Sequence, residues 1–289
     1  MPLAMCRLLG YYAHRPASLA ELIGEAGLRD FTALSAFHRD GWGMAWADRG
    51  RIRVHKSPLR ASGDPGYDDL ARRRLGRTGI VHLRWATPGL AVGPENSHPF
   101  CRADVAMAHN GAIHPQGRLP ELLPPAWERL MTGRTDSERY FLHILYRLQA
   151  RGEMVTAVGE TAASITARFT VNSLNAVLLT PTALYAVSCH DRSAIPEARL
   201  RERGYPGSAE EIARHFDLAY RQTADGVVVA SSDWPQDPRH GWTTLPNGHV
   251  MMIAGDGLRT KIEPLNAEAG SPHQRLPRGR RPSTGAEPA

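Results

Sequence analysis

Several features that define other protein classes are scarce or missing in this chain of 289 residues. Its three cysteines are too few and too scattered for a disulfide framework, which favours a reducing, cytoplasmic environment. No run of about 18 apolar residues is present, so no membrane-spanning helix is expected. The first residues also lack the basic start and long apolar core of a secretory signal. The sequence therefore predicts a cytoplasmic protein that does not act at a membrane.

Lysine is nearly absent, because Lys56 and Lys261 are the only two lysines. The formal net charge of +6 therefore comes from arginine, and half of it lies in residues 271–289, where four arginines and one glutamate give +3. Basic tails usually stay solvated, and no ribbon of aromatic and basic residues precedes this one. Nucleic acid is therefore not an expected partner. The 13 histidines include no pair with the spacing of a zinc site, so no metal is expected.

The rest of the composition is that of an ordinary globular domain, with 42% hydrophobic and 22% charged residues. Residues 6–265 carry regular patterning and are expected to form one domain. Residues 266–289 are rich in proline, glycine and arginine without periodicity, so a disordered tail is expected there. No internal repeat is present.

Short apolar runs typical of strands lie on both sides of two helical segments. Residues 135–151 repeat apolar side chains at helical spacing before the stop signal Gly152, and residues 155–167 form the second predicted helix. Ser18 and Glu21 have the spacing of a capping box, which predicts a short helix. The predicted strands are 7–13, 41–46, 51–55, 79–85, 105–109, 173–179, 183–188, 226–231, 249–253 and 258–262. This order predicts an α+β fold, a four-layer αββα sandwich with helices outside two stacked antiparallel sheets.

Cys6 is the candidate nucleophile. A cysteine that attacks an amide needs a base, and at the start of a chain it can use its own α-amine, whose pKa is about 7.7–8.0. Met5 stands directly before Cys6, and initiator methionine is readily removed before a small residue. Residues 1–5 are therefore expected to be absent or removed in the mature protein, either because translation starts at Met5 or because they form a propeptide. The alternative is a buried strand cysteine without a catalytic role.

Five short segments, each a weak signal alone, occur in a characteristic order. They are Cys-Arg-Leu-Leu-Gly at 6–10, Asp-Gly-Trp-Gly at 40–43, His-Leu-Arg-Trp-Ala-Thr at 82–87, His-Asn-Gly at 109–111 and Gly-Arg-Thr-Asp-Ser-Glu at 133–138. Together they resemble the class II glutamine amidotransferases, from Cys6 to Pro264. The stand-alone branch without a synthase domain is most similar, and it includes amidotransferase-like proteins of glutathione degradation and the γ-glutamyl hydrolase of ergothioneine synthesis. The late segments at 225–231 and 241–242 support that branch.

The resemblance implies how a substrate is bound. Arg84 matches the family's clamp on the substrate α-carboxylate, for which a guanidinium is suited because it can donate two parallel hydrogen bonds. Asp136 matches the carboxylate that holds the α-ammonium, and Trp85 would form a wall of the pocket. The residues alone leave alternatives open, because Arg84 could form a structural ion pair, Asp136 could cap the helix that begins at Ser137, and Trp42 and Trp85 could belong to the core.

Asn110 and Gly111 match the oxyanion hole of the family, with the Asn side-chain amide and the Gly backbone N–H as donors. The alternative for this pair is a type I′ turn, which Asn-Gly favours. His82 and His109 lie at predicted strand ends near the site, and a structural role is favoured over proton transfer for both.

The resemblance implies an N-terminal-nucleophile amidohydrolase without a cofactor. Cys6 would attack the side-chain amide of glutamine or of a γ-glutamyl compound and form a γ-glutamyl thioester, whose hydrolysis releases glutamate. Pro88-Gly89 stands where synthase-linked relatives carry His-Gly, so strict glutamine specificity is not expected. Two alternatives remain open. One is a glutaminase that delivers ammonia to a partner subunit, a separate synthase. The other is a non-catalytic regulatory protein in which residues 1–5 cap the amine of Cys6.

Overall fold

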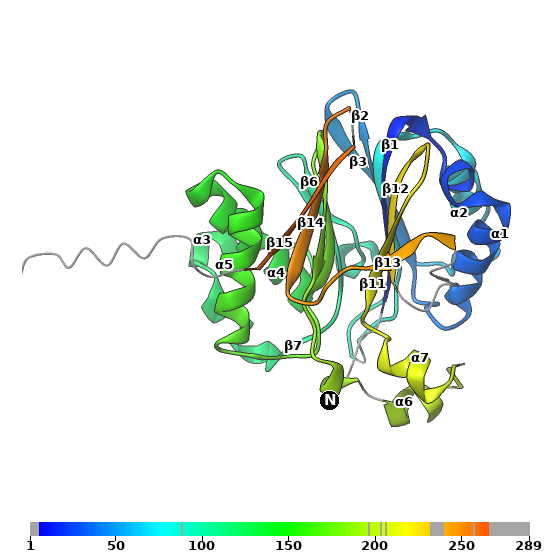
Figure 1. Cartoon of the computed structure of the whole chain (residues 1–289). Coiled ribbons are helices and arrows are strands. Elements are labelled where there is room, and N and C mark those ends of the chain that lie inside the picture. The colour runs from blue at the N-terminus through cyan, green and yellow to red at the C-terminus, as the bar shows by residue number, and fades with distance from the viewer. Residues whose placement is uncertain are drawn as a thin grey trace, which may run out of the picture.

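Two β-sheets packed face to face occupy the centre of the protein, as the computed structural model shows (Figure 1). The structure describes residues 6–87, 89–195, 197–202, 204–205, 207–231, 240–256 and 258–265. The expected disordered tail at 266–289 and the expected loss of residues 1–5 both fall outside these residues.

Within this part of the chain, the first sheet has seven antiparallel strands, and its middle strand is β1. The spatial order is β13 (Trp242–Thr244), β11 (Leu218–Gln222), β12 (Gly226–Ser231), β1 (Arg7–Ala17), β4 (Gly76–Leu83), β2 (Trp42–Asp48) and β3 (Arg51–Ser57). Leu9 of β1 lies opposite Ala230 of β12 on one side and Val81 of β4 on the other. β1 begins directly after Cys6 and is paired with β12 and β4. This pairing fixes the strand that follows the candidate nucleophile.

The second sheet has six antiparallel strands among the described residues. Its order is β15 (Arg259–Pro264), β14 (His249–Ala254), β10 (Ala183–Ser188), β9 (Asn175–Leu179), β6 (Val105–Asn110) and β5 (Phe100–Arg102). Beside it, β7 (Ile113–His114) pairs with β8 (Thr170–Val171). β6 ends at Asn110, opposite Asn175 of β9, so the end of this sheet presents the predicted oxyanion residues.

Two helices cover the outer face of each sheet (Figure 1). α1 (Leu19–Ala33) and α2 (Pro65–Arg72) lie on the first sheet, and α4 (Asp136–Arg151) and α5 (Met154–Thr166) lie on the second. The remaining helical turns are α3 (Pro125–Glu128), α6 (Glu197–Glu202), α7 (Ala209–Ala213), and the 3₁₀ turns η1 (Leu34–Ala36), η2 (Pro94–Asn96), η3 (Gln116–Leu122) and η4 (Arg192–Ala194). No helix in the described part of the chain is both long enough and apolar enough to cross a membrane.

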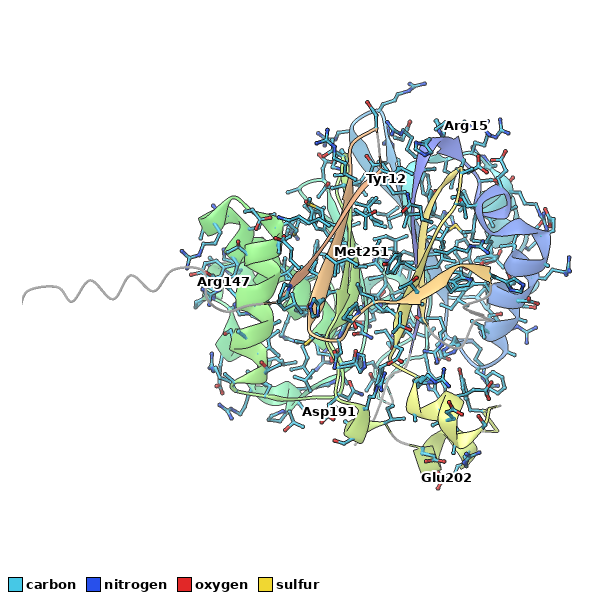
Figure 2. The ribbon with its side chains drawn as sticks, in the orientation of Figure 1. Tyr12, Arg15, Arg147, Asp191, Glu202 and Met251 are labelled. Atoms are coloured by element: carbon cyan, nitrogen blue, oxygen red, sulfur yellow. The ribbon has the colours of Figure 1, made fainter. Side chains whose placement is uncertain are left out.

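Three apolar layers hold these elements together. Between the two sheets, Leu8 and Tyr12 of β1 pack in one cluster with Val177 of β9 and Met251 of β14. Figure 2 shows Tyr12 and Met251 inside this layer, whereas Arg15 and other charged side chains lie at the outside. Separate clusters join each sheet to its helices. The predicted four-layer αββα sandwich is therefore confirmed.

The helix boundaries follow the capping signals of the sequence. Ser18 and Glu21 form the predicted capping box of α1, although this helix continues past a kink at Gly24 (φ 77°) and is longer than expected. The α4 helix ends at Gly152 in the left-handed conformation (φ 73°), as predicted. Its N-cap is Thr135, whose side chain accepts from the backbone N–H of Glu138. The alternative in which Asp136 is the cap is therefore wrong by one residue.

Candidate active site

Cys6 lies where β1, β4 and β6 meet, and only 4% of it is exposed. Its backbone N–H donates to Oδ1 of Asn110, at the end of β6, over 2.9 Å. The backbone N–H of Trp85, just beyond β4, donates to Sγ of Cys6 over 3.4 Å, and the carbonyl oxygen of Trp85 lies 3.7 Å from Sγ. The ends of three strands thus fix the main chain and the side chain of Cys6.

Burial raises the pKa of the Cys6 thiol from 9.0 to about 11, although the N–H of Trp85 and the cations of Arg84 and Arg7 act in the opposite direction. At neutral pH a thiol with this pKa is almost entirely protonated, and the thiolate is the nucleophilic form. Catalysis by Cys6 therefore requires a base close to Sγ. A free α-amine on Cys6 itself would be such a base.

The backbone of Asn110 and Gly111 does not have the conformation of a type I′ hairpin turn. Neither residue has a positive φ, which a type I′ turn requires at both of its central positions, so the turn alternative is wrong. The Nδ2 atom of Asn110 is buried and has no hydrogen-bond partner among the described residues. A Cβ on Gly111 would lie 1.9 Å from the carbonyl oxygen of Ser173, so only glycine fits there. A buried donor left unpaired costs about 1–3 kcal/mol, which a ligand oxygen could recover.

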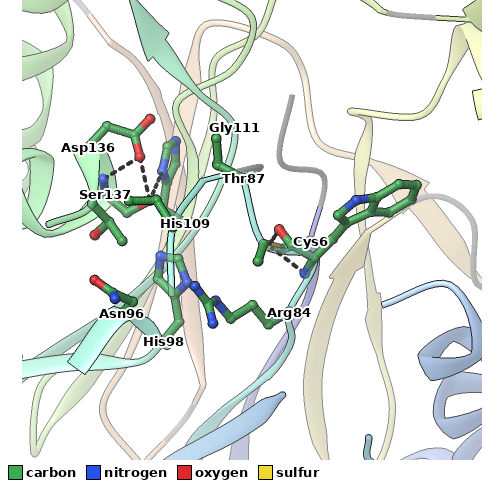
Figure 3. A pocket seen from close by; sticks show the side chains of 13 residues that line it. Cys6, Arg84, Thr87, Asn96, His98, His109, Gly111, Asp136 and Ser137 are labelled. Atoms are coloured by element: carbon green, nitrogen blue, oxygen red, sulfur yellow. Dashed lines mark hydrogen bonds between the residues drawn. The ribbon is translucent and has the colours of Figure 1, made fainter. Parts of the chain in front are cut away.

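Arg84 is 3% exposed and follows the last residue of β4. Its guanidinium donates to the carbonyl oxygens of Asp40 (3.4 Å) and Ala91 (3.2 Å). These partners are main-chain oxygens rather than carboxylates, so the structural ion pair is not the arrangement observed. The guanidinium points along the pocket toward His98 (Figure 3). Arg84 therefore keeps its positive charge available to an anion in the pocket.

Trp85 has two separate environments. Its backbone contacts Sγ of Cys6, whereas its indole packs edge-on to His38, with the ring centroids 5.6 Å apart. The indole also belongs to an apolar cluster that contains Leu200 and Phe216. Trp85 thus combines the two roles that the sequence left open, as a pocket residue and as part of a core. Trp42 belongs to the core alone, because it is fully buried against α1 and α2.

Asp136 is the first residue of α4 and is 4% exposed. Its carboxylate accepts from the backbone N–H groups of Ile113 and Ser137, both at 2.9 Å. Two main-chain donors therefore hold the negative charge in place at the pocket.

His109, directly before the predicted oxyanion residues, is tied down at both ring nitrogens. Nε2 lies 3.0 Å from the carbonyl oxygen of Ser173, so Nε2 carries the hydrogen and Nδ1 accepts from the Ser137 hydroxyl at 2.9 Å. Burial lowers the pKa of His109, although Asp136 acts in the opposite direction. This arrangement supports the structural role favoured for His109.

His98 is a pocket residue that the sequence reasoning missed. It is 5% exposed, and neither ring nitrogen has a hydrogen-bond partner in the described part of the chain. Burial lowers the pKa of His98 well below its ordinary value, and His82, whose ring centroid is 4.2 Å away, acts in the same direction. The available signal was the polar run Glu95 to His98 just before a short strand. Among the described residues, no group of three or more His, Cys, Asp or Glu is placed to hold a metal ion.

One pocket brings these residues together (Figure 3). Five of the six predicted site residues line it, namely Cys6, Arg84, Trp85, Gly111 and Asp136. The sixth, Asn110, is bonded to the backbone nitrogen of Cys6. A thiol, a cation and a carboxylate therefore share one site, and the Asn110 amide is hydrogen-bonded to the residue that carries the thiol.

Comparison with known proteins identifies the family of the chain. The family model of class II glutamine amidotransferases matches residues 5–275. A Haemophilus influenzae protein, provisionally named a glutamine amidotransferase, is 30% identical over 263 residues, covering 86% of this chain and 84% of that protein. The gamma-glutamyl-hercynylcysteine sulfoxide hydrolase of Mycolicibacterium smegmatis is 26% identical over 259 residues, covering 86% of this chain and 96% of that protein.

Solved structures agree at the level of the fold. A glutamine aminotransferase class-II domain protein from Silicibacter pomeroyi has a TM-score of 0.59 at 18% identity, covering 90% of this chain and 100% of that one. The family match spans nearly the whole chain. The chain therefore belongs to the class II glutamine amidotransferases and is an amidohydrolase.

Proposed function

We propose that this enzyme hydrolyses the side-chain amide of glutamine or of a γ-glutamyl compound, with Cys6 as its nucleophile. The observation that carries the proposal is that one pocket is lined by Cys6, by the buried cation of Arg84 and by the buried carboxylate of Asp136. The M. smegmatis relative is named for its action on a γ-glutamyl compound, which supports this substrate class.

The amino-acid end of the substrate carries one negative and one positive group, and the pocket offers a partner for each. Arg84 binds the α-carboxylate, and Asp136 binds the α-ammonium. Trp85 holds the wall of the pocket next to Sγ of Cys6, because its backbone N–H donates to the sulfur. The γ-amide is thereby directed toward the thiol.

The base in this mechanism is the α-amine of Cys6, freed by the absence or removal of residues 1–5. It takes the thiol proton while Sγ bonds to the amide carbon, and the carbonyl oxygen becomes negative. Nδ2 of Asn110 and the N–H of Gly111 stabilise that oxygen. When the carbon–nitrogen bond breaks, the leaving amine takes the proton from the α-ammonium, and a γ-glutamyl thioester remains.

Water then completes the cycle. The α-amine accepts a proton from the attacking water, and the carbon–sulfur bond of the thioester breaks. The departing sulfur takes that proton back, so glutamate leaves and the thiol is restored. Nucleophile and base both belong to one residue.

Two proteins test this proposal, one that begins at Cys6 and one in which residues 1–5 cannot be removed. The first should release glutamate from γ-glutamyl amides. The second should fold equally well but show about a hundredth of the activity or less, because an acylated nitrogen is not basic. Intact mass defines the first residue, and glutamate release is measured with glutamine, glutathione and other γ-glutamyl amides.

Cys6→Ala in the shorter protein is the matched control, and it should bind glutamate without hydrolysing any amide. Full activity with residues 1–5 attached would contradict the amine as base, and activity in Cys6→Ala would contradict the nucleophile. Glutamine hydrolysis that appears only when a synthase partner is added would favour the glutaminase subunit instead.

A further inference from the structure

We infer that Arg7 is a positioning residue that holds Cys6 by its carbonyl oxygen, and that the segment between β10 and β11 holds Arg7 in turn. The inference rests on the proposed role of Cys6 as nucleophile. Arg7 is the first residue of β1 and directly follows Cys6.

The guanidinium of Arg7 is fully buried and donates in two directions. Nη1 donates to the carbonyl oxygen of Cys6 over 2.6 Å. Nη2 donates to the Tyr205 hydroxyl over 2.9 Å and lies 2.9 Å from the ring nitrogens of His215. A guanidinium is a rigid plane of donors, so contacts on one edge fix the direction of the other.

His215 can lie against the Arg7 guanidinium because its ring is neutral. It is 1% exposed, and burial lowers the pKa of His215 well below its ordinary value, with the charge of Arg7 acting in the same direction. A neutral imidazole can pack against the guanidinium without a repelling charge. His215 thus holds Nη2 by close contact, and the Tyr205 hydroxyl supplies the acceptor.

The segment that supplies Tyr205 and His215 also belongs to the apolar cluster around Cys6. Its apolar side chains form one cluster with Cys6 and Trp85, and the members from this segment are Leu200, Tyr205, Ile212 and Phe216. These residues lie in and around α6 and α7. The segment therefore shares an apolar cluster with Cys6 and also reaches it through Arg7.

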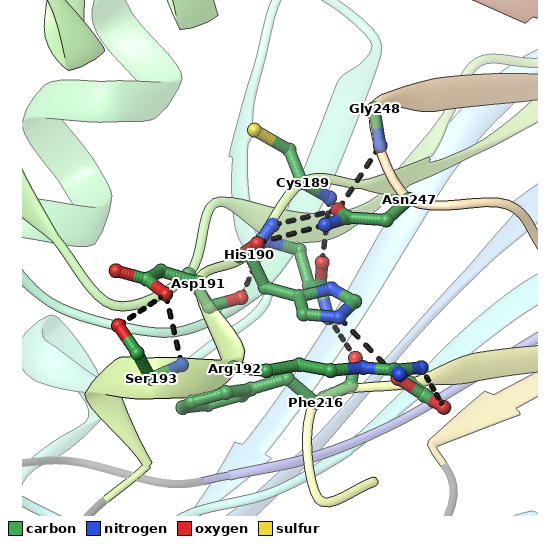
Figure 4. A network of polar contacts seen from close by, with 11 residues as sticks. Cys189, His190, Asp191, Arg192, Ser193, Phe216, Asn247 and Gly248 are labelled. Carbon is green, nitrogen blue, oxygen red and sulfur yellow. Dashed lines mark hydrogen bonds and ion pairs between the residues drawn. The ribbon is translucent and has the colours of Figure 1, made fainter.

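Both ends of this segment are anchored (Figure 4). Asn247 accepts from the backbone N–H of His190 over 3.0 Å and donates to its carbonyl oxygen over 2.8 Å. At the other end, Asp217 accepts from Nη2 of Arg192 over 2.8 Å, and Nε2 of His190 lies 3.3 Å from the same carboxylate. Arg192 and His190, near the start of the segment, bind Asp217 at its end. These contacts hold the segment in the position from which Tyr205 and His215 contact Arg7.

This arrangement matters because a chain that begins at Cys6 has no preceding residue to hold the nucleophile. Asn110 binds the nitrogen of Cys6 at 2.9 Å, and Arg7 binds its carbonyl oxygen at 2.6 Å. The two contacts fix both ends of the Cys6 main chain and hence the direction in which Sγ points. A displacement of about 1 Å can cost a reaction about 100-fold.

Three variants of the protein that begins at Cys6 test the inference. Arg7→Met should lower kcat by about 30-fold or more with KM within about threefold, because the substrate contacts remain. Arg7→Lys restores the charge without the planar fork, so it should recover part of kcat. Tyr205→Phe removes a single hydroxyl and should lower kcat about fivefold. Tyr12→Phe is the matched control, since its hydroxyl donates to Thr182 between the sheets, away from the pocket.

The pH dependence of Cys6 alkylation by iodoacetamide gives a second readout that a purely structural role would not move. Its midpoint should rise in Arg7→Met, because a nearby positive charge favours the thiolate, and should return toward the wild-type midpoint in Arg7→Lys. If Arg7→Met does not fold, as judged by thermal melting, Tyr205→Phe decides the question.

The inference is overturned if Arg7→Lys and Tyr205→Phe both match Tyr12→Phe, or if their losses appear only in KM or in the folded fraction. A wild-type protein that hydrolyses no γ-glutamyl amide would contradict the proposed function instead. The alkylation midpoints would still report whether Arg7 controls the thiol.

Discussion

The backbone nitrogen of Cys6 donates to Oδ1 of Asn110 over 2.9 Å, while Nδ2 of the same amide has no partner among the described residues. One side chain thus has two roles under the proposed mechanism. Its oxygen holds the main chain of Cys6, and its unpaired nitrogen would donate to the oxygen of a substrate. The two roles can be separated by substitution.

Asn110→Asp keeps an acceptor for the nitrogen of Cys6 but removes the Nδ2 donor and adds a negative charge beside the developing oxyanion. We expect kcat to fall by about 10²- to 10³-fold while the protein remains folded. Asn110→Ala loses both contacts and should be no more active. Steady-state kinetics and thermal melting measure the two effects, and a variant that melts early with normal activity per folded molecule would reduce Asn110 to a structural role.

Arg84→Lys keeps a positive charge but cannot span the carbonyl oxygens of Asp40 and Ala91 and still present a planar fork to a carboxylate. The specificity constant should fall about 100-fold, or about 2.7 kcal/mol, mainly through KM. Arg77→Lys is the control, because Arg77 bonds Ala13 and Asp256 toward the other end of β4. Unchanged kinetics in Arg84→Lys would remove Arg84 from substrate binding.

Acid should destabilise the protein through His82. Burial, assisted by the charge of Arg84, lowers the pKa of His82 from 6.5 to about 3. Between these two pH values, His82 is protonated in the unfolded chain but neutral in the folded protein. The contribution of His82 to stability is therefore present above pH 6.5 and is lost as pH falls toward about 3.

The variant His82→Gln should flatten the fall of the unfolding free energy with pH. Urea denaturation between about pH 7.5 and about pH 4 measures this slope. The exposed His14, replaced in the same way, should leave it unchanged. Identical slopes for wild type and His82→Gln would show that His82 is not held neutral.

Local signals in the sequence predicted most of the fold. The β2–β3 hairpin formed where expected, because Arg49 (φ 48°) and Gly50 (φ 76°) take the left-handed conformation of a tight turn. The α4 helix likewise begins and ends at residues with a local capping signal. Several short elements were not predicted, among them α2 and β11. The cap of α2 was visible as Asp64 followed by Pro65, whereas β11 is a short strand defined by its pairing with β12 and β13.

The candidate site was predictable only where its residues occur in recognisable segments. The pocket joins Cys6 to Asp136, two positions that no local propensity relates. Arg7 shows the limit clearly, because its partners Tyr205 and His215 are 198 and 208 residues away in the sequence. His98 was missed because a lone histidine carries no signal of burial. Tertiary packing, rather than pattern, gives these residues their roles.

The place of β1 in its sheet has a consequence for heat inactivation. Chain ends normally fray well before the rest of a protein opens. Here the residues after Cys6 are hydrogen-bonded to β4 on one side and to β12 on the other. Gly10 also lies so close to the opposite sheet that a Cβ there would be 2.7 Å from Val177. Detaching the strand that follows Cys6 means opening the middle of the first sheet. We therefore expect activity and the global fold to be lost together on heating.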